Sequence, residues 1–185
     1  VGCRYYSRSY EYIPFDANLE VSFDDYEFSP ILGYREILYT EYNDPVFAEK
    51  HKITPTCKRS ENWGFWCHSF DSLCPPDKYF DTHPEYFALR DGKRQRENTQ
   101  LCLSNPDVLE IVCENLAKFI EQKPDALYWS VSQNDNASFC ECESCRALDE
   151  QDGSHIGSVV NFVNKVAGRF PDKIISTLAY WYTRQ

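Results

Sequence analysis

Asp135 follows an apolar run of the sequence, and a tight group of cysteines follows Asp135 in turn. The alternation of apolar residues over 126–132 predicts a strand, and the polar residues after it predict a loop. In α/β folds, the loops at the carboxyl ends of strands carry the chemistry. The sequence therefore predicts a functional site over residues 132–145.

Cys140, Cys142 and Cys145 are spaced closely enough to bind one tetrahedral metal ion. Cys102 is the predicted fourth ligand, and Cys67 and His68 are the alternatives. A structural zinc site is one interpretation. Disulfides to distant cysteines are the other, because nine cysteines in one chain are typical of an oxidising compartment. A site closed by four protein ligands leaves no open position for substrate, so no cofactor is expected to be required for catalysis.

A carboxylic acid at the end of a strand fits the general acid of a glycosidase, which protonates the leaving oxygen. Asp135 is the predicted catalytic residue on this basis. The alternative is that Asp135 caps the turn that follows it, which Asp does well. The predicted substrate-binding residues lie at or just beyond the ends of predicted strands: Asn43, His68, Asn134, Tyr180 and Tyr182.

Composition narrows the classes of partner. The net charge of −10 argues against nucleic acid as a ligand, and the basic run 90–96 reads as a solvated hairpin tip around Asp91 and Gly92. No apolar stretch is long enough to predict a membrane span. The aromatic content of 16% suits both a core and a sugar-binding cleft. Because the chain lacks Met and starts at Val1, residues 1–185 are expected to be an incomplete piece of one domain.

The order of predicted elements indicates an α/β fold. Amphipathic patterns predict helices over 105–123 and 155–170, and a capping Asp44 predicts a short helix to about residue 52. Strands are expected near five residues: Cys3, Tyr34, Phe65, Tyr128 and Ile175. Alternating helices and strands imply parallel βαβ units with long loops and a small hairpin excursion. An open parallel sheet and part of a (β/α)8 TIM-type barrel both fit this order.

Several motifs in a fixed order resemble a known family over residues 34–185. They are His83-Pro-Glu-Tyr-Phe87, Asp91-Gly-Lys-Arg94, Gln100-Leu-Cys-Leu-Ser-Asn-Pro106, Ser132-Gln-Asn-Asp135 with its Cys-x-Cys-x-x-Cys group, and the ending around Phe162 and Tyr180. This set is similar to the bacterial domain of unknown function 4838, whose members look like relatives of the α-glucuronidases of glycoside hydrolase family 67. The resemblance implies a partial (β/α)8 barrel completed by further strands and accessory domains of a parent chain. It also implies export from the cytoplasm.

The resemblance carries catalytic residues over only in part. In the α-glucuronidases the general acid is a Glu within an Asn-Ala-Asp-Ser-Glu-Gly stretch, and Asn136 stands at its place here. Asp135 is the adjacent carboxyl group, and the family's catalytic bases would fall beyond Gln185. The predicted function is a glycoside hydrolase-like domain acting on a uronic-acid-containing or related polysaccharide. A non-catalytic carbohydrate-binding or structural module is the alternative.

Overall fold

The computed structural model describes residues 2–15, 18, 20, 22 and 25–184. The chain divides into two compact units, Val1–Ser60 and Glu61–Gln185, and the boundary falls within the short helix α2 (Arg59–Asn62). Each unit is described by itself below.

The first unit is built from short elements: β1 (Arg4–Ser7), β2 (Tyr10–Tyr12), the 3-10 helices η1 (Thr40–Asn43) and η2 (Thr56–Lys58), and α1 (Pro45–Lys50). The two strands pair as an antiparallel hairpin. The predicted helix after Asp44 is confirmed, because the Asp44 carboxylate accepts a hydrogen bond from Phe47 N (2.9 Å) and Pro45 occupies the first turn. His51 ends this helix and joins it to β1 through the carbonyl of Tyr5 (3.0 Å).

The strand predicted around Tyr34 is absent from the described structure, where that segment runs as loop into η1. Its polar groups pair with residues later in the first unit instead. Arg35 exchanges hydrogen bonds with Thr54, and Glu36 accepts from Arg59 (2.5 Å). A strand needs a neighbouring strand to satisfy its backbone, and these contacts replace one.

The second unit contains most of the helical residues. Its elements are α3 (Phe70–Leu73), α4 (Pro76–Tyr79), η3 (Pro84–Tyr86), β3 (Leu89–Arg90), β4 (Lys93–Arg94), α5 (Pro106–Gln122), β5 (Tyr128–Ser130), α6 (Glu143–Asp152), α7 (Ile156–Arg169), β6 (Ile174–Ser176) and η4 (Trp181–Thr183). Both predicted long helices are confirmed as α5 and α7, and β3 and β4 form the predicted hairpin around Asp91 and Gly92. Asn105 caps α5 by accepting from Asp107 N (2.9 Å).

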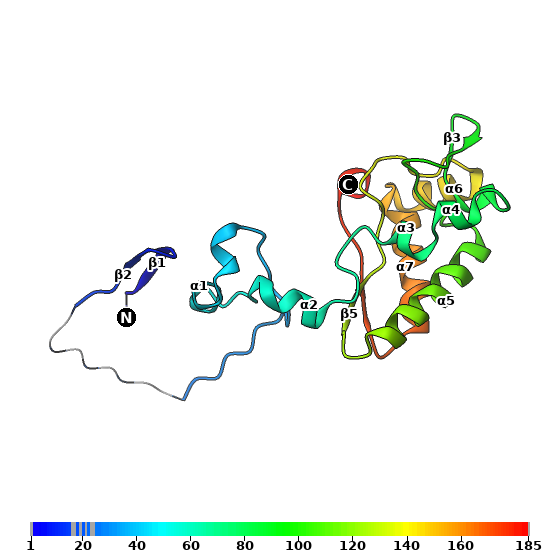
Figure 1. Ribbon diagram of the computed structural model, residues 1–185. Helices are drawn as coiled ribbons and strands as arrows, with labels where there is room; N and C mark the ends of the chain where they lie inside the picture. The colour runs from blue at the N-terminus through cyan, green and yellow to red at the C-terminus, as the bar shows by residue number, and fades with distance from the viewer. Residues whose placement is uncertain (1, 16–17, 19, 21, 23–24, 185) are drawn as a thin grey trace. The chain divides into compact units, whose positions relative to one another are not determined.

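One parallel strand pair lies beneath these helices. β5 and β6 pair in register from Tyr128 with Ile174 to Ser130 with Ser176, and α6 and α7 form the connection between them. Trp63 adds a single parallel bridge to Tyr128 on the other edge of β5. Figure 1 shows α5 and α7 next to each other, and they pack together.

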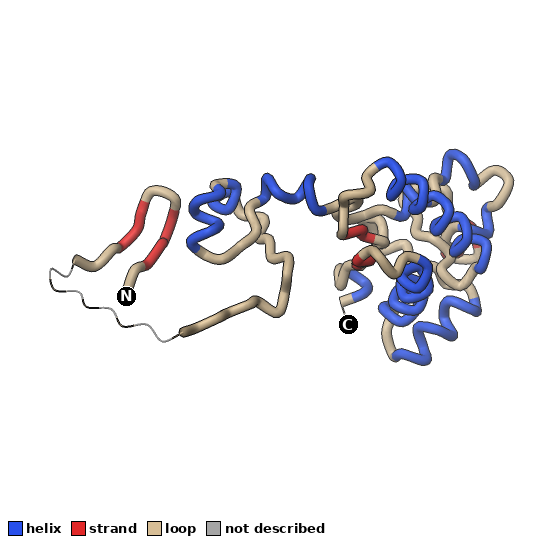
Figure 2. Tube along the Cα trace, turned by 90° about the horizontal axis from the view of Figure 1, so that it is seen from below, coloured by secondary structure: helices blue, strands red, loops and turns tan. Residues whose placement is uncertain are grey.

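The predicted partial barrel with about five parallel strands is wrong. The described residues form three two-stranded sheets, two antiparallel and one parallel, and loop and helix dominate the rest (Figure 2). β1 pairs locally with β2, and the segment at Trp63 supplies only one bridge. The strand expected over 174–182 stops at Ser176, because the Gln133 amide and the Thr183 hydroxyl take the carbonyls of residues 178 and 180.

The main hydrophobic core belongs wholly to the second unit. Fully buried Phe70, Leu116, Trp129, Val131 and Phe162 join helices α3, α5 and α7 to β5. A smaller cluster contains Ala88 and the buried cysteines Cys102, Cys140 and Cys145. Within the described chain, no helix combines the length and apolarity needed to cross a bilayer.

Candidate functional site

The loop after β5 lies against the segment that precedes α3. The backbone amides of Ser69 and Phe70 both donate to the Ser132 carbonyl (3.1 and 3.2 Å), and Ser132 N donates to the Ser69 hydroxyl (3.1 Å). His68 Nδ1 donates to the Gln133 carbonyl (2.8 Å). These bonds bring the segment around His68 to the carboxyl end of β5.

Asp71 and Asn134 form a reciprocal pair within this junction. Asn134 Nδ2 donates to the Asp71 carboxylate (2.7 Å), and Asp71 N donates to Asn134 Oδ1 (3.1 Å). Partial burial raises the pKa of Asp71, against the opposing effect of the Asn134 hydrogen bond. A second carboxyl group, with a raised pKa, therefore stands beside the residue that precedes Asp135.

Asp135 lies exposed between these segments and the end of the chain. Loss of solvation raises the pKa of Tyr180, and the negative charge of the neighbouring Asp135 carboxylate raises it further. The ring of Tyr180 also meets His68 edge-on, with centroids 5.8 Å apart, and stacks on Trp181 at 5.9 Å. A carboxylate, an imidazole and two aromatic rings thus come together.

Backbone geometry supports a specialised role for this group. His68 and Trp181 both adopt positive φ, at 50° and 53°, a region that bulky residues rarely occupy. Such outliers concentrate at functional sites, where the surrounding structure holds them. Trp181 is also 52% exposed, which makes its ring accessible to a ligand.

Buried amides hold the segments in place. Gln133 is fully buried, and its Nε2 donates to the Tyr180 carbonyl (3.1 Å) and to the Thr183 hydroxyl (2.8 Å). Asn134 is 6% exposed and also donates to the Thr99 carbonyl (2.8 Å), so its amide serves to position Asp71.

Two predicted ligand-binding residues lie elsewhere. Tyr182 packs between Phe139 and His155, with ring centroids at 5.3 and 6.3 Å, and burial raises its pKa. Asn43 belongs to the first unit, where it is exposed and ends η1 rather than a strand.

The four predicted metal ligands converge. The sulfur atoms of Cys102, Cys140, Cys142 and Cys145 all lie within 4.8 Å of one another. Cys102 Sγ is 3.6 Å from Cys142 Sγ and 4.0 Å from Cys145 Sγ. Tetrahedral zinc with Zn–S bonds of ~2.3 Å requires sulfurs about 3.8 Å apart, whereas a disulfide bond is ~2.05 Å long. The spacing therefore fits a shared metal ion, and none of the four cysteines is in a disulfide bond.

Several polar groups surround the sulfur atoms. Contact with the Cys140 and Cys145 thiols lowers the pKa of Cys102, and contact with Cys102 raises the pKa of Cys140. Leu89 N donates to Cys140 Sγ (3.4 Å), and the Arg94 guanidinium lies 3.8 Å from that sulfur. These donors would stabilise metal-bound thiolates as outer ligand partners.

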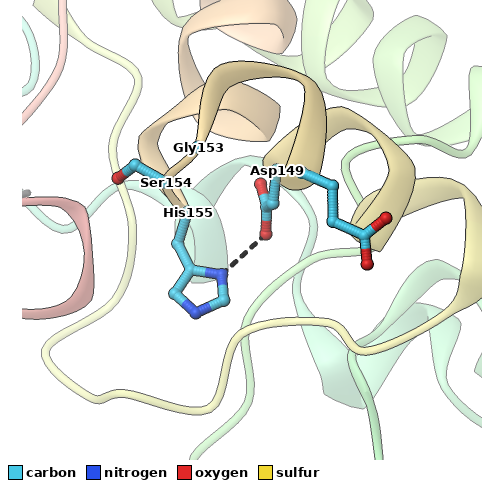
Figure 3. A pocket seen from close by; sticks show the side chains of 5 residues that line it. Asp149, Gly153, Ser154 and His155 are labelled. Atoms are coloured by element: carbon cyan, nitrogen blue, oxygen red, sulfur yellow. Dashed lines mark hydrogen bonds and ion pairs between the residues drawn. The ribbon is translucent and has the colours of Figure 1, made fainter.

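A separate hollow of about 420 Å³ lies where α6 meets α7 (Figure 3). His155 Nδ1 lies 2.8 Å from one oxygen of Asp149, and the other oxygen accepts from Ser158 N (3.0 Å). Gly153, with φ of 70°, ends α6 beside them. These bonds close the turn between the helices, and none of the predicted site residues lines the hollow.

Comparison of the sequence with protein families gives a match over residues 5–185 to the family described as Domain of unknown function (DUF4838). The chain belongs to this family. No curated protein matches this DUF4838 chain.

Asp71 and Gln100 of the DUF4838 domain were not among the predicted site residues. Asp71 stands three positions after His68, just beyond the predicted strand at Trp63, so the argument that selected Asp135 applies to it equally. Gln100 carries no local signal, because its role depends on a loop more than thirty residues away.

Proposed function

We propose that the domain acts on carbohydrate at the group formed by Asp135, Asp71, His68, Tyr180 and Trp181. The observation that carries the proposal is the pairing of Asp71 with Asn134, the residue before Asp135, beside accessible aromatic rings. Glycoside hydrolysis uses two carboxyl groups, one as acid and one as base or nucleophile. Flat aromatic faces suit the apolar faces of sugar rings.

Asp135 is the proposed proton donor, with Asp71 as the second carboxylate. The reverse assignment has its own support, because partial burial raises the pKa of Asp71 and a general acid must hold its proton at working pH. His68 and Tyr180 would orient sugar hydroxyls, and Asn134 would fix Asp71.

A panel of aryl uronides and neutral aryl glycosides tests the proposal with the wild type, Asp135→Asn and Asp71→Asn. Each of the two substitutions should lower turnover by roughly 10²–10⁴-fold, because each removes one catalytic carboxyl group. The acid variant should keep most activity on dinitrophenyl glycosides, whose leaving group needs no proton, whereas a base or nucleophile variant should recover activity with azide. Asp77→Asn, at an exposed carboxylate that pairs with Arg96, is the matched control. Undiminished turnover in both variants would contradict the proposal.

The second candidate is a non-catalytic carbohydrate-binding module. Exposure of the Tyr180 and Trp181 rings favours it, since stacking needs no acid. Saturable binding of polysaccharide that is lost in Trp181→Ala, without turnover by the wild type, would select this function.

Uronic-acid-containing polysaccharides are the first substrates to test, on the resemblance to α-glucuronidases. Because such polymers occur outside cells, we also propose that the domain works in an extracytoplasmic compartment. Fractionation of the native host, with detection of the domain by antibody, tests this location.

We further propose that Cys102, Cys140, Cys142 and Cys145 hold a structural zinc ion. Four thiolates would complete its coordination, so the metal would stabilise the loops and take no part in hydrolysis. Elemental analysis should find about one zinc per chain, and Cys142→Ser should lower that content.

A further inference from the structure

Gln100 connects the cysteine cluster to the loop that carries Asp135. Its side chain is 1% exposed and lies two residues before Cys102. Gln100 Nε2 is 2.9 Å from the carbonyl of Asn134 and 2.9 Å from that of Asn136. Its Oε1 accepts from Asn134 N at 2.9 Å. One buried amide thus binds the backbone on both sides of Asp135.

Backbone hydrogen bonds connect the Gln100 segment to the cysteine cluster. Cys102 N donates to the Tyr86 carbonyl and Ala88 N donates to the Gln100 carbonyl, both at 2.8 Å, so residues 86–88 run beside residues 100–102. Glu141 N donates to the Leu89 carbonyl (2.8 Å). A metal ion shared by Cys102 and Cys140 would therefore lock the Gln100 segment against the segment that leaves the Asp135 loop.

We propose that Gln100 is a positioning residue through which metal binding at the four cysteines sets the geometry of Asp135. This inference rests on the proposed function only because it takes Asp135 as the functional group. A buried amide that satisfies several backbone groups has one favoured arrangement, because each lost hydrogen bond leaves a desolvated polar atom. Loss of the metal frees Cys102, and Gln100 then no longer restrains residues 134–136.

Amide hydrogen exchange of the full chain measures this coupling. Exchange over residues 133–138 is compared for zinc-loaded and chelator-stripped protein, in the wild type and in Gln100→Met, which keeps the side-chain length but removes both polar groups. Gln95→Met is the control, because Gln95 is a half-buried glutamine of the same hairpin region whose side chain donates to the Lys93 carbonyl and not to the Asp135 loop.

Stripping the wild type should speed exchange over residues 133–138 by tenfold or more while α5 stays protected. Gln100→Met should show the fast exchange already with zinc bound, and stripping should then add less than twofold. Gln95→Met should behave as wild type. If Gln100→Met does not fold, as judged by loss of protection in α5, the stripped wild type decides alone.

Three results would overturn the proposal. Stripping could leave exchange over residues 133–138 unchanged in the wild type, or it could speed this exchange in Gln100→Met by as much as in the wild type. The third is that the protein does not bind zinc. Binding of the aryl glycoside panel separates this result from the proposed function. If no sugar binds but exchange responds as expected, the coupling stands and the carbohydrate function fails. If a sugar binds, its affinity should fall about tenfold in zinc-loaded Gln100→Met and remain unchanged in Gln95→Met.

Discussion

At the scale of single residues, Asp135 and Tyr180 form the pair on which the proposed site depends. The phenol of Tyr180 loses solvation and faces a carboxylate, and both effects oppose its ionisation. Burial is also the main cause of the raised pKa of Tyr182, two residues on, but the carboxylate that adds to it there is Asp149. The two tyrosines therefore report on different carboxylates.

Asp135→Asn should lower the pKa of Tyr180, because the substitution removes the negative charge that opposes the phenolate. The pKa should stay above the ordinary value for tyrosine, since the loss of solvation remains. Titration of ¹³C-labelled tyrosine followed by NMR measures the shift, with Tyr182 as the internal control. A Tyr180 pKa that does not change would show that Asp135 does not face the phenol in solution.

Asp71→Asn should stabilise the protein at neutral pH. A carboxyl group whose folded pKa is raised favours folding below its unfolded pKa, and that contribution is lost as pH rises through the folded pKa. Asparagine cannot ionise but can still accept from Asn134. The variant should therefore gain in melting temperature over the wild type at pH 7 and show little gain at pH 3. Thermal unfolding at both pH values is the measurement, and an equal effect at both would contradict the raised pKa.

At the scale of elements, the parallel sheet depends on close approach of one segment to β5. Gly64 N donates to the Tyr128 carbonyl (2.9 Å), and a Cβ at Gly64 would overlap the ring of Trp129. The buried Trp129 ring lies in the main core and cannot move without disturbing it. Glycine at this position is thus a packing requirement of the sheet edge.

Gly64→Ala should lower the free energy of unfolding by about 1–3 kcal/mol, the usual effect of overpacking a core. Gly168→Ala is the matched control, because open space surrounds that position near the end of α7. The control should gain about 0.5–1 kcal/mol from the better helix propensity of alanine. Urea unfolding measures both, and equal effects of the two substitutions would refute the packing argument.

At the scale of the whole molecule, the second unit contains both core clusters and both proposed sites. Every residue of the two clusters, including the partly buried ones, falls between Phe65 and Tyr182. The first unit has short elements and many exposed aromatic side chains, such as Tyr6, Tyr10 and Phe28. Cooperative stability is therefore expected to reside in residues 61–185.

A chain of residues 61–185 should fold by itself and bind zinc. Calorimetry should show one transition, at a melting temperature within a few degrees of the main transition of the full chain. Chelation should lower that temperature by about 10 °C or more, because a ligand that binds only the folded state stabilises it. An unfolded fragment would instead show that the first unit is required for the core.

Local patterns in the sequence determined the elements whose signals are local. Asp44 and Asn105 cap the predicted helices, Asp91 and Gly92 turn the predicted hairpin, and the amphipathic faces of α5 and α7 lie where their periodicity placed them. The cysteine spacing also identified three of the four sulfurs that meet, and Cys102 was the predicted fourth. Capping, turn formation and helical periodicity depend on residues close together in the chain, which is why they could be read directly.

Only the tertiary structure decided which strand-like segments pair into sheets and which distant polar groups form hydrogen bonds. The apolar run after Ile174 ends as a strand at Ser176 because Gln133, forty-odd residues earlier, takes its carbonyls. The pairing of Asp71 with Asn134 and the hold of Gln100 on the Asp135 loop likewise join distant positions. Such contacts form only when the chain brings separate segments together, and neither periodicity nor spacing encodes that approach.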